Sequence, residues 1–305
     1  MSGDRQRLAT APLVAGCWSW GDRRTWGYGE RFGDDELREV VAELTTVDAA
    51  YFDTAEIYGR GASERLLGRL APDAAVSGKF FPYPWRCTYG QFARALHASL
   101  RRLRRPRMSL YQIHHDVPGA LLKRWTDHLA RARREGLIEQ IGTSNLPPVT
   151  LAAVADRLAA QGEQVAAHQV RYNLCDRRVE SDGTLELCRD RGIIVLAHSA
   201  LGQGLLGGNY RPGHQPLGRR ARHLTEPLLR QTQPVRDLLT RFGGRYGVSP
   251  AAVALSWLRG QGVVPVVGLR DGRQAREALA GCALRLPEDV RSTLDTVTAP
   301  WRGTP

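Results

Sequence analysis

Short apolar runs alternate with longer stretches of helical periodicity along the whole chain. Such runs, bounded by Gly, Pro and polar residues, are typical of strands that are buried on both faces of a parallel sheet. Eight runs predict strands, at Leu13–Gly16, Ala50–Thr54, Ala75–Lys79, Ser109–His114, Ile138–Ser144, Ala166–Tyr172, Ile193–Ala197 and Val263–Val267.

Helical patterns follow these strands, at residues 34–46, 62–71, 89–105, 118–136, 147–161, 181–191, 233–246 and 271–280, with an additional helix at 250–259. Eight strands that each precede a helix predict an α/β fold of the (β/α)8 TIM-barrel type, which we expect to form a single domain over residues 1–305. A doubly wound sheet has the same alternation and stays an alternative. Residues 199–231 are rich in Gly, Arg and Pro, and we expect a long irregular cofactor or substrate loop there.

The formal net charge is +12, from 43 basic and 31 acidic residues. Such a surplus can indicate nucleic acid or an anionic membrane, but here it forms no tail, and we expect neither partner. Only Lys79 and Lys123 are lysines; the other basic residues are Arg. A lysine in so arginine-rich a chain indicates a position that needs a compact ammonium group.

The five cysteines are odd in number, widely spaced and free of any CxxC pair. They predict neither a disulfide framework nor a zinc site, and they favour a reducing, cytoplasmic compartment. Residues 14–17 resemble a lipoprotein cleavage box. The apolar segment before them is short and contains Pro12, so a first strand is favoured over a signal peptide.

Two further motifs fail on physical grounds. Residues 202–207 match G-x-G-x-x-G, but the glycine- and proline-rich segment after them cannot open the helix that a Rossmann turn requires. His114 and His115 are adjacent in a predicted strand, so their side chains are expected on opposite faces, and we predict no metal site.

Four proton-handling residues lie at the carboxyl ends of successive strands or just beyond them: Asp53, Tyr58, Lys79 and His114. In a barrel this rim carries the catalytic groups. The sequence therefore predicts an active site built from these four side chains.

The motifs around them resemble the aldo-keto reductase family. The matching segments are YFDTAEIYGRGASE at 51–64, LYQIH at 110–114, IGTSN at 141–145, QVRYNL at 169–174, HSALGQGLL at 198–206 and PVVGLR at 265–270. The resemblance implies reduction of an aldehyde or ketone by NADPH, with Tyr58 as general acid. It also implies that Lys79 lowers the pKa of Tyr58, that Asp53 positions Lys79, and that His114 orients the carbonyl.

The resemblance also implies the cofactor site. Its residues are Gly16, Cys17, Trp18, Ser144, Asn145, Gln169, His198, Ser199, Leu201, Gln203, Gly268, Arg270, Gln274 and Glu277. Arg270 beside a ribose 2′-phosphate favours NADPH over NADH. His198 stands where the family usually has a Tyr that stacks on the nicotinamide. Either its ring stacks there and titrates near pH 6.5, or it turns outward and Tyr210, or another residue of the 199–231 loop, covers the nicotinamide.

The resemblance further predicts a substrate pocket that includes Trp20, Phe80, Trp85 and His115. An aromatic wall suits a bulky or planar carbonyl compound, and a ketone, an imine and a pyridoxal-like aldehyde all stay open. The alternative function is a cofactor-binding regulatory subunit on the same fold, like the potassium-channel beta subunits. The segment before the first strand is too short for the hairpin that plugs the barrel floor in many members. The oligomeric state is not determined by the sequence.

Overall fold

The structure is a computed structural model that describes residues 3–47, 50–117, 119–216 and 218–303. Eight parallel strands close into a barrel in chain order, with β8 paired to β1. The strands are β1 (Val14–Gly16), β2 (Tyr51–Asp53), β3 (Ala75–Phe80), β4 (Leu110–Ile113), β5 (Ile141–Ser144), β6 (Val165–Arg171), β7 (Ile194–His198) and β8 (Val264–Gly268). The predicted (β/α)8 barrel is confirmed, and the doubly wound alternative, which has an open sheet, is wrong.

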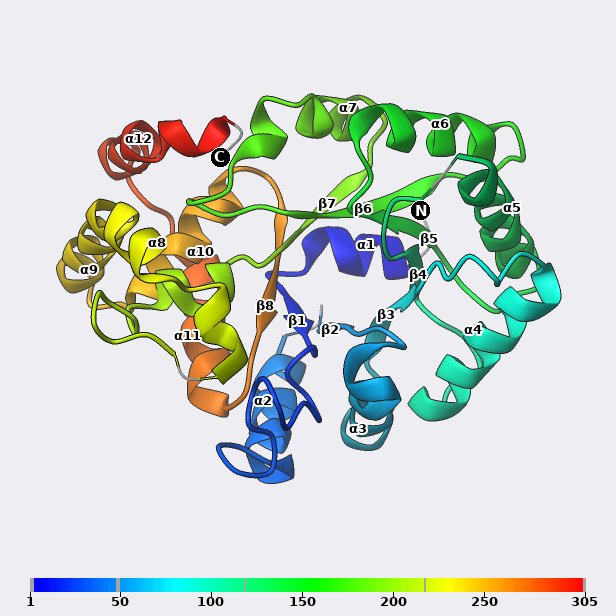
Figure 1. The fold of residues 1–305 in the computed structure, drawn as a ribbon, viewed down its shortest axis with the longest axis horizontal. Helices are drawn as coiled ribbons and strands as arrows, with labels where there is room; N and C mark the ends of the chain where they lie inside the picture. Colours follow the sequence, from blue (N-terminus) through cyan, green and yellow to red (C-terminus); the bar gives the residue numbers. More distant parts are fainter. Residues whose placement is uncertain (1–2, 48–49, 118, 217, 304–305) are drawn as a thin grey trace.

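Helices surround the barrel (Figure 1). Those that correspond to predicted patterns are α2 (Asp34–Thr45), α3 (Ala62–Leu70), α4 (Tyr89–Leu103), α5 (Gly119–Arg134), α6 (Pro148–Ala159), α7 (Thr184–Asp190), α9 (Gln233–Tyr246), α10 (Pro250–Gly260) and α11 (Gly272–Ala283). Three helices were not predicted, α1 (Gly3–Thr10), α8 (Glu226–Gln231) and α12 (Glu288–Val297).

Helix α1 closes the floor of the barrel, at the centre of Figure 1. Its Leu8 is fully buried and packs with Val14, Leu110 and Leu196, which belong to the barrel strands. Arg5 donates a 2.7 Å hydrogen bond to the carbonyl of Gly192, just before β7, so the helix lies at the amino ends of the strands. One short helix, rather than a hairpin, therefore covers the barrel floor.

The parallel register brings the carboxyl ends of the strands together at the opposite rim. Gly16 of β1 is level with Asp53 of β2 and with Gly268 of β8. Arg171 of β6 is likewise level with His198 of β7. Residues far apart in the chain thereby become neighbours around one opening.

The stretch 199–231 is more ordered than predicted. It contains the 3-10 helices η3 (Gly202–Gly207) and η4 (Gly218–Arg222) and the short helix α8 (Glu226–Gln231). Gln203 and Gly204 have φ values of 57° and 100°, which interrupt helical geometry inside η3. No α-helix opens at the G-x-G-x-x-G segment, in agreement with the rejection of a Rossmann turn.

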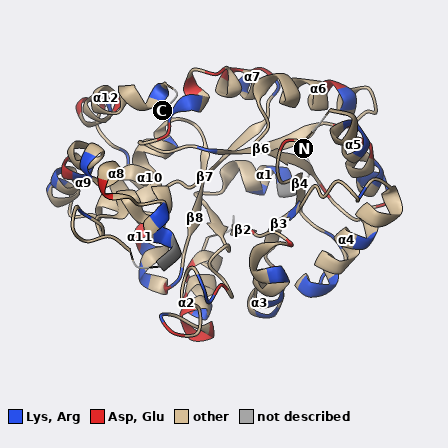
Figure 2. Cartoon of the chain, in the orientation of Figure 1, with Lys and Arg blue, Asp and Glu red and all other residues tan. Residues whose placement is uncertain are grey.

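The positive charge is spread over helices all around the barrel, from α3 and α4 to α9 and α11 (Figure 2). Many of these arginines pair with acids at the surface, as Arg157 does with Asp127 and Arg276 with Glu43. Among the described residues, no helix combines the length and the apolar character needed to cross a membrane.

Helices α10 and α11 approach each other closely at Gly281. A β-carbon at this position would lie 2.6 Å from the Cα atom and 2.8 Å from the carbonyl oxygen of Ala252. Backbone atoms cannot turn aside as a flexible side chain can. Glycine at 281 therefore sets the spacing of two helices whose amino-terminal residues line the cavity described below.

We expect Gly281→Ala to lower the free energy of unfolding by about 1–3 kcal/mol, because the backbone of α10 must shift. Gly244→Ala in α9 is the matched control, since its β-carbon would meet nothing within 4 Å. That change should raise the free energy by about 0.5–1 kcal/mol, the usual gain of Ala over Gly inside a helix. Urea denaturation of both variants measures the difference; equal effects would contradict the packing argument.

Candidate active site at the carboxyl end of the barrel

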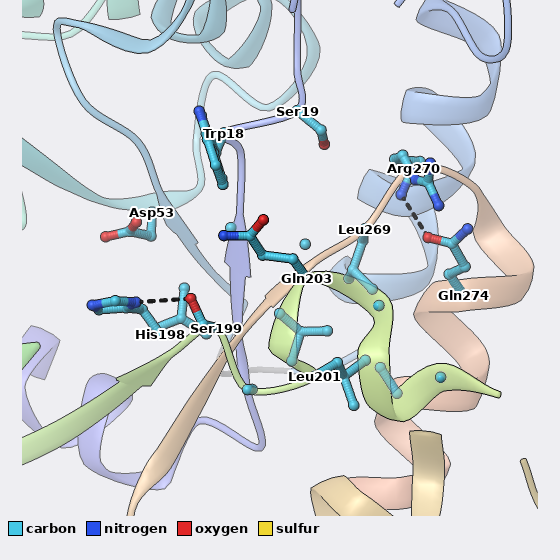
Figure 3. A pocket seen from close by; sticks show the side chains of 18 of the residues that line it. Trp18, Ser19, Asp53, His198, Ser199, Leu201, Gln203, Leu269, Arg270 and Gln274 are labelled. Atoms are coloured by element: carbon cyan, nitrogen blue, oxygen red, sulfur yellow. Dashed lines mark hydrogen bonds between the residues drawn. The ribbon is translucent and has the colours of Figure 1, made fainter. Parts of the chain in front are cut away.

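A cavity of about 960 Å³ opens at this rim. Its walls come from the strand ends, from the segment after β7 and from α11. Figure 3 shows Asp53 and His198 toward one side of the cavity and Arg270 and Gln274 toward the other. We call these two regions the barrel end and the α11 end.

Lys79 links Asp53 and Tyr58 at the barrel end. Its ammonium is fully buried and forms an ion pair with the Oδ2 atom of Asp53. It also donates to the carbonyl of Thr54 at 3.0 Å and to the Tyr58 hydroxyl at 3.5 Å. The other Asp53 oxygen accepts from Nε2 of Gln169 at 2.8 Å. The structure thus brings three of the four predicted proton-handling residues, Asp53, Tyr58 and Lys79, into contact with one another.

Tyr58 is held by the turn that follows β2. It begins the 3-10 turn η1 (Tyr58–Gly61), and its N–H donates to the carbonyl of Ala55 at 3.0 Å. The Thr54 and Ser63 hydroxyls lie 2.8 Å apart, and Ser63 donates to the carbonyl of Cys17. These bonds fix the loop to the first strand and direct the phenol over Lys79.

Burial and the charge of Lys79 have opposite effects on Tyr58. Burial raises the pKa of Tyr58, and this effect outweighs the opposing attraction of phenolate to the Lys79 ammonium. The pKa of Lys79 is also raised: burial lowers it, but Asp53 and Tyr58 more than offset that effect. Lys79 thus lowers the pKa of Tyr58 as predicted, but burial has the larger effect, and Tyr58 is a neutral proton donor beside a charged lysine.

His114 and His115 lie together, contrary to the prediction. Strand β4 ends at Ile113, so the alternation of a strand no longer applies beyond it. The two rings stack with centroids 4.6 Å apart and planes 5° apart, and both line the cavity. Burial, followed by the charge of Lys79, lowers the pKa of His114 to about 2. Among the described residues, no three His, Cys, Asp or Glu side chains gather as metal ligands do.

A hydrogen-bond chain fixes His198 in the wall of the cavity. Nδ2 of Asn145 donates to the carbonyl of His114 at 3.1 Å, which leaves Oδ1 of Asn145 to accept from Nε2 of His198 at 2.9 Å. The Nδ1 atom of His198 can then accept from the Ser199 hydroxyl at 3.1 Å. Burial, with Lys79 and Arg171 nearby, lowers the pKa of His198 to about 3. The ring is therefore neutral at physiological pH, and titration near pH 6.5 is wrong for this histidine.

Arginines dominate the α11 end. The backbone N–H of Arg270 donates to Oε1 of Gln274 at 3.2 Å, whereas its guanidinium faces the cavity beside the rings of Trp26 and Phe32. Arg220 reaches in from η4, where it contacts the Trp26 ring and donates to the Tyr210 hydroxyl. Burial, and then the charge of Arg220, lowers the pKa of Arg270.

Most predicted cofactor residues meet in this one cavity. Those that line it are Gly16, Trp18, Asn145, Gln169, His198, Ser199, Leu201, Gln203, Gly268, Arg270, Gln274 and Glu277. Cys17 and Ser144 do not line it, because both are buried in the surrounding structure. Of the four catalytic candidates, Asp53, Tyr58 and His114 line the cavity and Lys79 lies beneath them.

The aromatic part of the predicted substrate pocket needs correction. Trp20 is fully buried, and its Nε1–H donates to the carbonyl of Leu269 at 3.0 Å. Phe80 follows the inward-facing Lys79 in β3, so it faces outward and packs against Phe92 and Trp125. Trp85 is 67% exposed and stacks on Tyr83 outside the cavity. Of this predicted group, only His115 lines the cavity.

Sequence reasoning missed several cationic residues of the cavity. Arg171, Arg178, Arg220 and Arg273 all line it. Arg220 comes from the loop after β7, where no motif marks it. In a chain with 43 basic residues, composition does not single out any of these arginines.

Comparison with known proteins gives a consistent result. The model of the aldo/keto reductase family matches residues 12–299. The chloroplastic pyridoxal reductase of Arabidopsis thaliana is 30% identical over 306 residues, which cover 94% of this chain and 83% of that protein. An uncharacterized oxidoreductase of Mycobacterium tuberculosis is 32% identical over 300 residues, covering 94% of this chain and 89% of its own. The crystal structure of a Klebsiella pneumoniae aldo-keto reductase in complex with NADPH superposes with a TM-score of 0.72 at 23% identity and covers 94% of this chain and 90% of that one.

The neutral state of His198 can be tested directly. Because burial lowers its pKa to about 3, the ring should show no change of charge between pH 8 and pH 5. NMR of the ring nitrogens, assigned with the variant His198→Gln, measures this. The urea-unfolded chain is the control, since its histidines should titrate near pH 6.5, about the value of an unperturbed imidazole. A folded-state midpoint above pH 6 for His198 would contradict the burial argument.

Proposed function

This chain belongs to the aldo/keto reductase family, and on that premise we propose that it reduces an aldehyde or ketone to the alcohol with NADPH, with Tyr58 as general acid. The observation that carries the proposal is the buried contact of Asp53, Lys79 and Tyr58 at one end of a cavity with arginines at the other. All four proton-handling residues are present, which favours turnover over a regulatory subunit that only binds cofactor.

The residues of the α11 end fit a dinucleotide phosphate. The guanidiniums of Arg270 and Arg220 repel each other, and the buried Nε of Arg220 has no partner among the described residues. Two neighbouring cations that repel each other, with no acid paired to either in the described structure, favour the binding of an anion. Arg270 and Gln274 would hold the adenosine phosphate, and Ser199, Leu201 and Gln203 would line the pyrophosphate.

The preference for NADPH over NADH rests on Arg270, aided by Arg220 and Arg273. Glu277, proposed for the adenine amino group, is already paired with Arg273 at 2.7 Å. A ribose 2′-phosphate would supply the negative charge that the α11 end of the cavity lacks. The Klebsiella structure, which holds NADPH in the same fold, supports this choice.

The cofactor, when bound, supplies the hydride; the protein supplies position and a proton. Tyr58 donates its hydroxyl proton to the carbonyl oxygen as negative charge develops there. Lys79 stabilises the resulting phenolate, and Asp53 holds Lys79 in place. The neutral ring of His114 can donate one N–H to the same oxygen.

The nicotinamide end would be held by amides and by His198. Gln169 uses its Nε2 on Asp53, which leaves its Oε1 as an acceptor for a carboxamide N–H. His198 is fixed through both ring nitrogens, so its flat face is the part available for stacking. Because the ring is neutral, stacking does not oppose a cationic nicotinamide.

The name of the Arabidopsis relative, pyridoxal reductase, supports an aromatic aldehyde as substrate class. We also place the protein in the cytoplasm, because all five cysteines are free thiols.

Tyr58→Phe should reduce turnover of NADPH with 4-nitrobenzaldehyde by at least about 100-fold, the scale of general-acid catalysis. Tyr89→Phe is the matched control, because the Tyr89 hydroxyl bonds Glu135 at the surface. Stopped-flow absorbance at the nicotinamide band follows the reaction. Full activity of Tyr58→Phe would remove Tyr58 from its proposed role.

Arg270→Ala should weaken NADPH binding by roughly 1.5–3 kcal/mol, as expected for a charge-assisted hydrogen bond, and leave NADH nearly unchanged. Arg276→Ala on the same helix is the control, because Arg276 pairs with Glu43 on the surface. Fluorescence titration gives both dissociation constants. Equal losses for the two cofactors would mean that Arg270 does not contact the 2′-phosphate.

A further inference from the structure

Two arginines give the barrel end of the cavity a positive charge that the proposed reaction does not use. Arg171 ends β6, Arg178 begins the 3-10 turn η2 (Arg178–Glu180), and both line the cavity. Asp176 is the one carboxylate that they share: Arg178 donates to it twice, at 2.8 and 2.7 Å, and Nε of Arg171 lies 3.7 Å from it. These two cations and the one shared anion sum to about +1, and Asp182, which does not line the cavity, is a further acid near Arg178.

No acid that lines the cavity removes this charge. Asp53 is paired with the buried Lys79, and Glu277 is paired with Arg273 at the α11 end. The three histidines of the barrel end, His114, His115 and His198, all have lowered pKa values because they are buried, so they are neutral.

Arg171 is connected to the catalytic candidates by a continuous wall. It is level with His198 on the neighbouring strand, and His198 bonds Asn145. Asn145 in turn bonds the carbonyl of His114, whose ring meets the Tyr58 ring with centroids 5.8 Å apart. The charge of Arg171 also contributes to the lowered pKa of His198, as expected for a neighbour on the same wall.

The loop that carries Arg178 is rigid. The adjacent Arg177 is buried, pairs with Glu180 at 2.6 Å and with Asp295 at 2.9 Å, and lies over the Trp257 ring. Asn173 and Asp176 exchange two backbone hydrogen bonds within the same turn. Asp176 is therefore held in place before any ligand binds, and so is the Arg178 fork bound to it.

Both arginines keep donors for a ligand. Arg178 uses Nε and Nη2 on Asp176, which leaves Nη1. The Arg171 guanidinium makes no hydrogen bond to the described part of the chain, and its side chain is 47% exposed. From this placement we infer that the substrate is a carbonyl compound with a carboxylate or phosphate group, which Arg171 and Arg178 bind while the carbonyl faces Tyr58. This inference rests on the proposed function and narrows its substrate class.

Matched pairs of aldehydes test the inference. The carboxylate arm compares 4-formylbenzoate with its neutral methyl ester, and the phosphate arm compares pyridoxal 5′-phosphate with pyridoxal. The ratio of kcat/KM, charged over neutral, should exceed one in at least one arm and should decrease with added salt. In Arg171→Gln/Arg178→Gln that ratio should fall by at least about tenfold, the scale of a charge-assisted hydrogen bond.

Two controls separate recognition from folding. Arg189→Gln removes the same charge from an exposed position of α7 outside the cavity and should keep the wild-type ratio. Arg171→Gln alone leaves the Arg178–Asp176 pair intact and should lower the ratio in the same direction. The arm in which the variants lower the kcat/KM ratio identifies the anion as carboxylate or phosphate.

A ratio near one in both arms, or a ratio kept in the double variant, overturns the inference and leaves the proposed reduction standing. If no aldehyde is reduced, the proposed function fails. The inference about Arg171 and Arg178 is then tested by ligand binding instead of by turnover. At least one of terephthalate and pyridoxine 5′-phosphate, neither of which can be reduced, should then quench tryptophan fluorescence of the wild type with a dissociation constant at least about tenfold lower than in the double variant. Equal or absent binding overturns the inference in that case as well.

Discussion

The buried ammonium of Lys79 is the constraint on which the site depends. A charge inside the barrel is tolerated only when it is paired and hydrogen-bonded, and Asp53, the carbonyl of Thr54 and Tyr58 meet that need. Gln169 occupies the second oxygen of Asp53, so the pair also joins β2 and β3 to β6. The contacts that satisfy this buried charge are therefore the same ones that set the geometry of the proposed catalytic residues.

Charge is distributed unevenly along the cavity. Arginines occur at both ends, and the barrel end also contains neutral imidazoles and amides. This arrangement suits a ligand set with anionic groups at its ends and an uncharged reacting centre between them. The overall charge of +12 has little bearing on it, because many surface arginines are paired with acids around the outside of the barrel.

His198 shows how a departure from a family pattern can be accommodated. The imidazole ring is smaller than the ring of the usual Tyr. Hydrogen bonds with Asn145 and Ser199 fix both nitrogens of this ring in place. Asn145 and Ser199 adopt left-handed backbone angles, with φ values of 56° and 55°, to make these contacts. Such strain is typical of positions where the surrounding structure requires a particular side-chain direction.

Periodicity and strand ends are local properties of the chain. The order of eight strands, the position of the rim and the placement of Asp53, Tyr58, Lys79 and His114 at that rim were therefore predictable from the sequence. The sequence did not determine which side chains reach the cavity. Phe80 turns outward and Cys17 is buried in the core, whereas Arg220 enters from a distant loop. These cases, and the pKa of each buried group, depend on neighbours far away in sequence, and so they follow from the tertiary structure. The neutral His198, bonded to Asn145 and lying near Lys79, is an example.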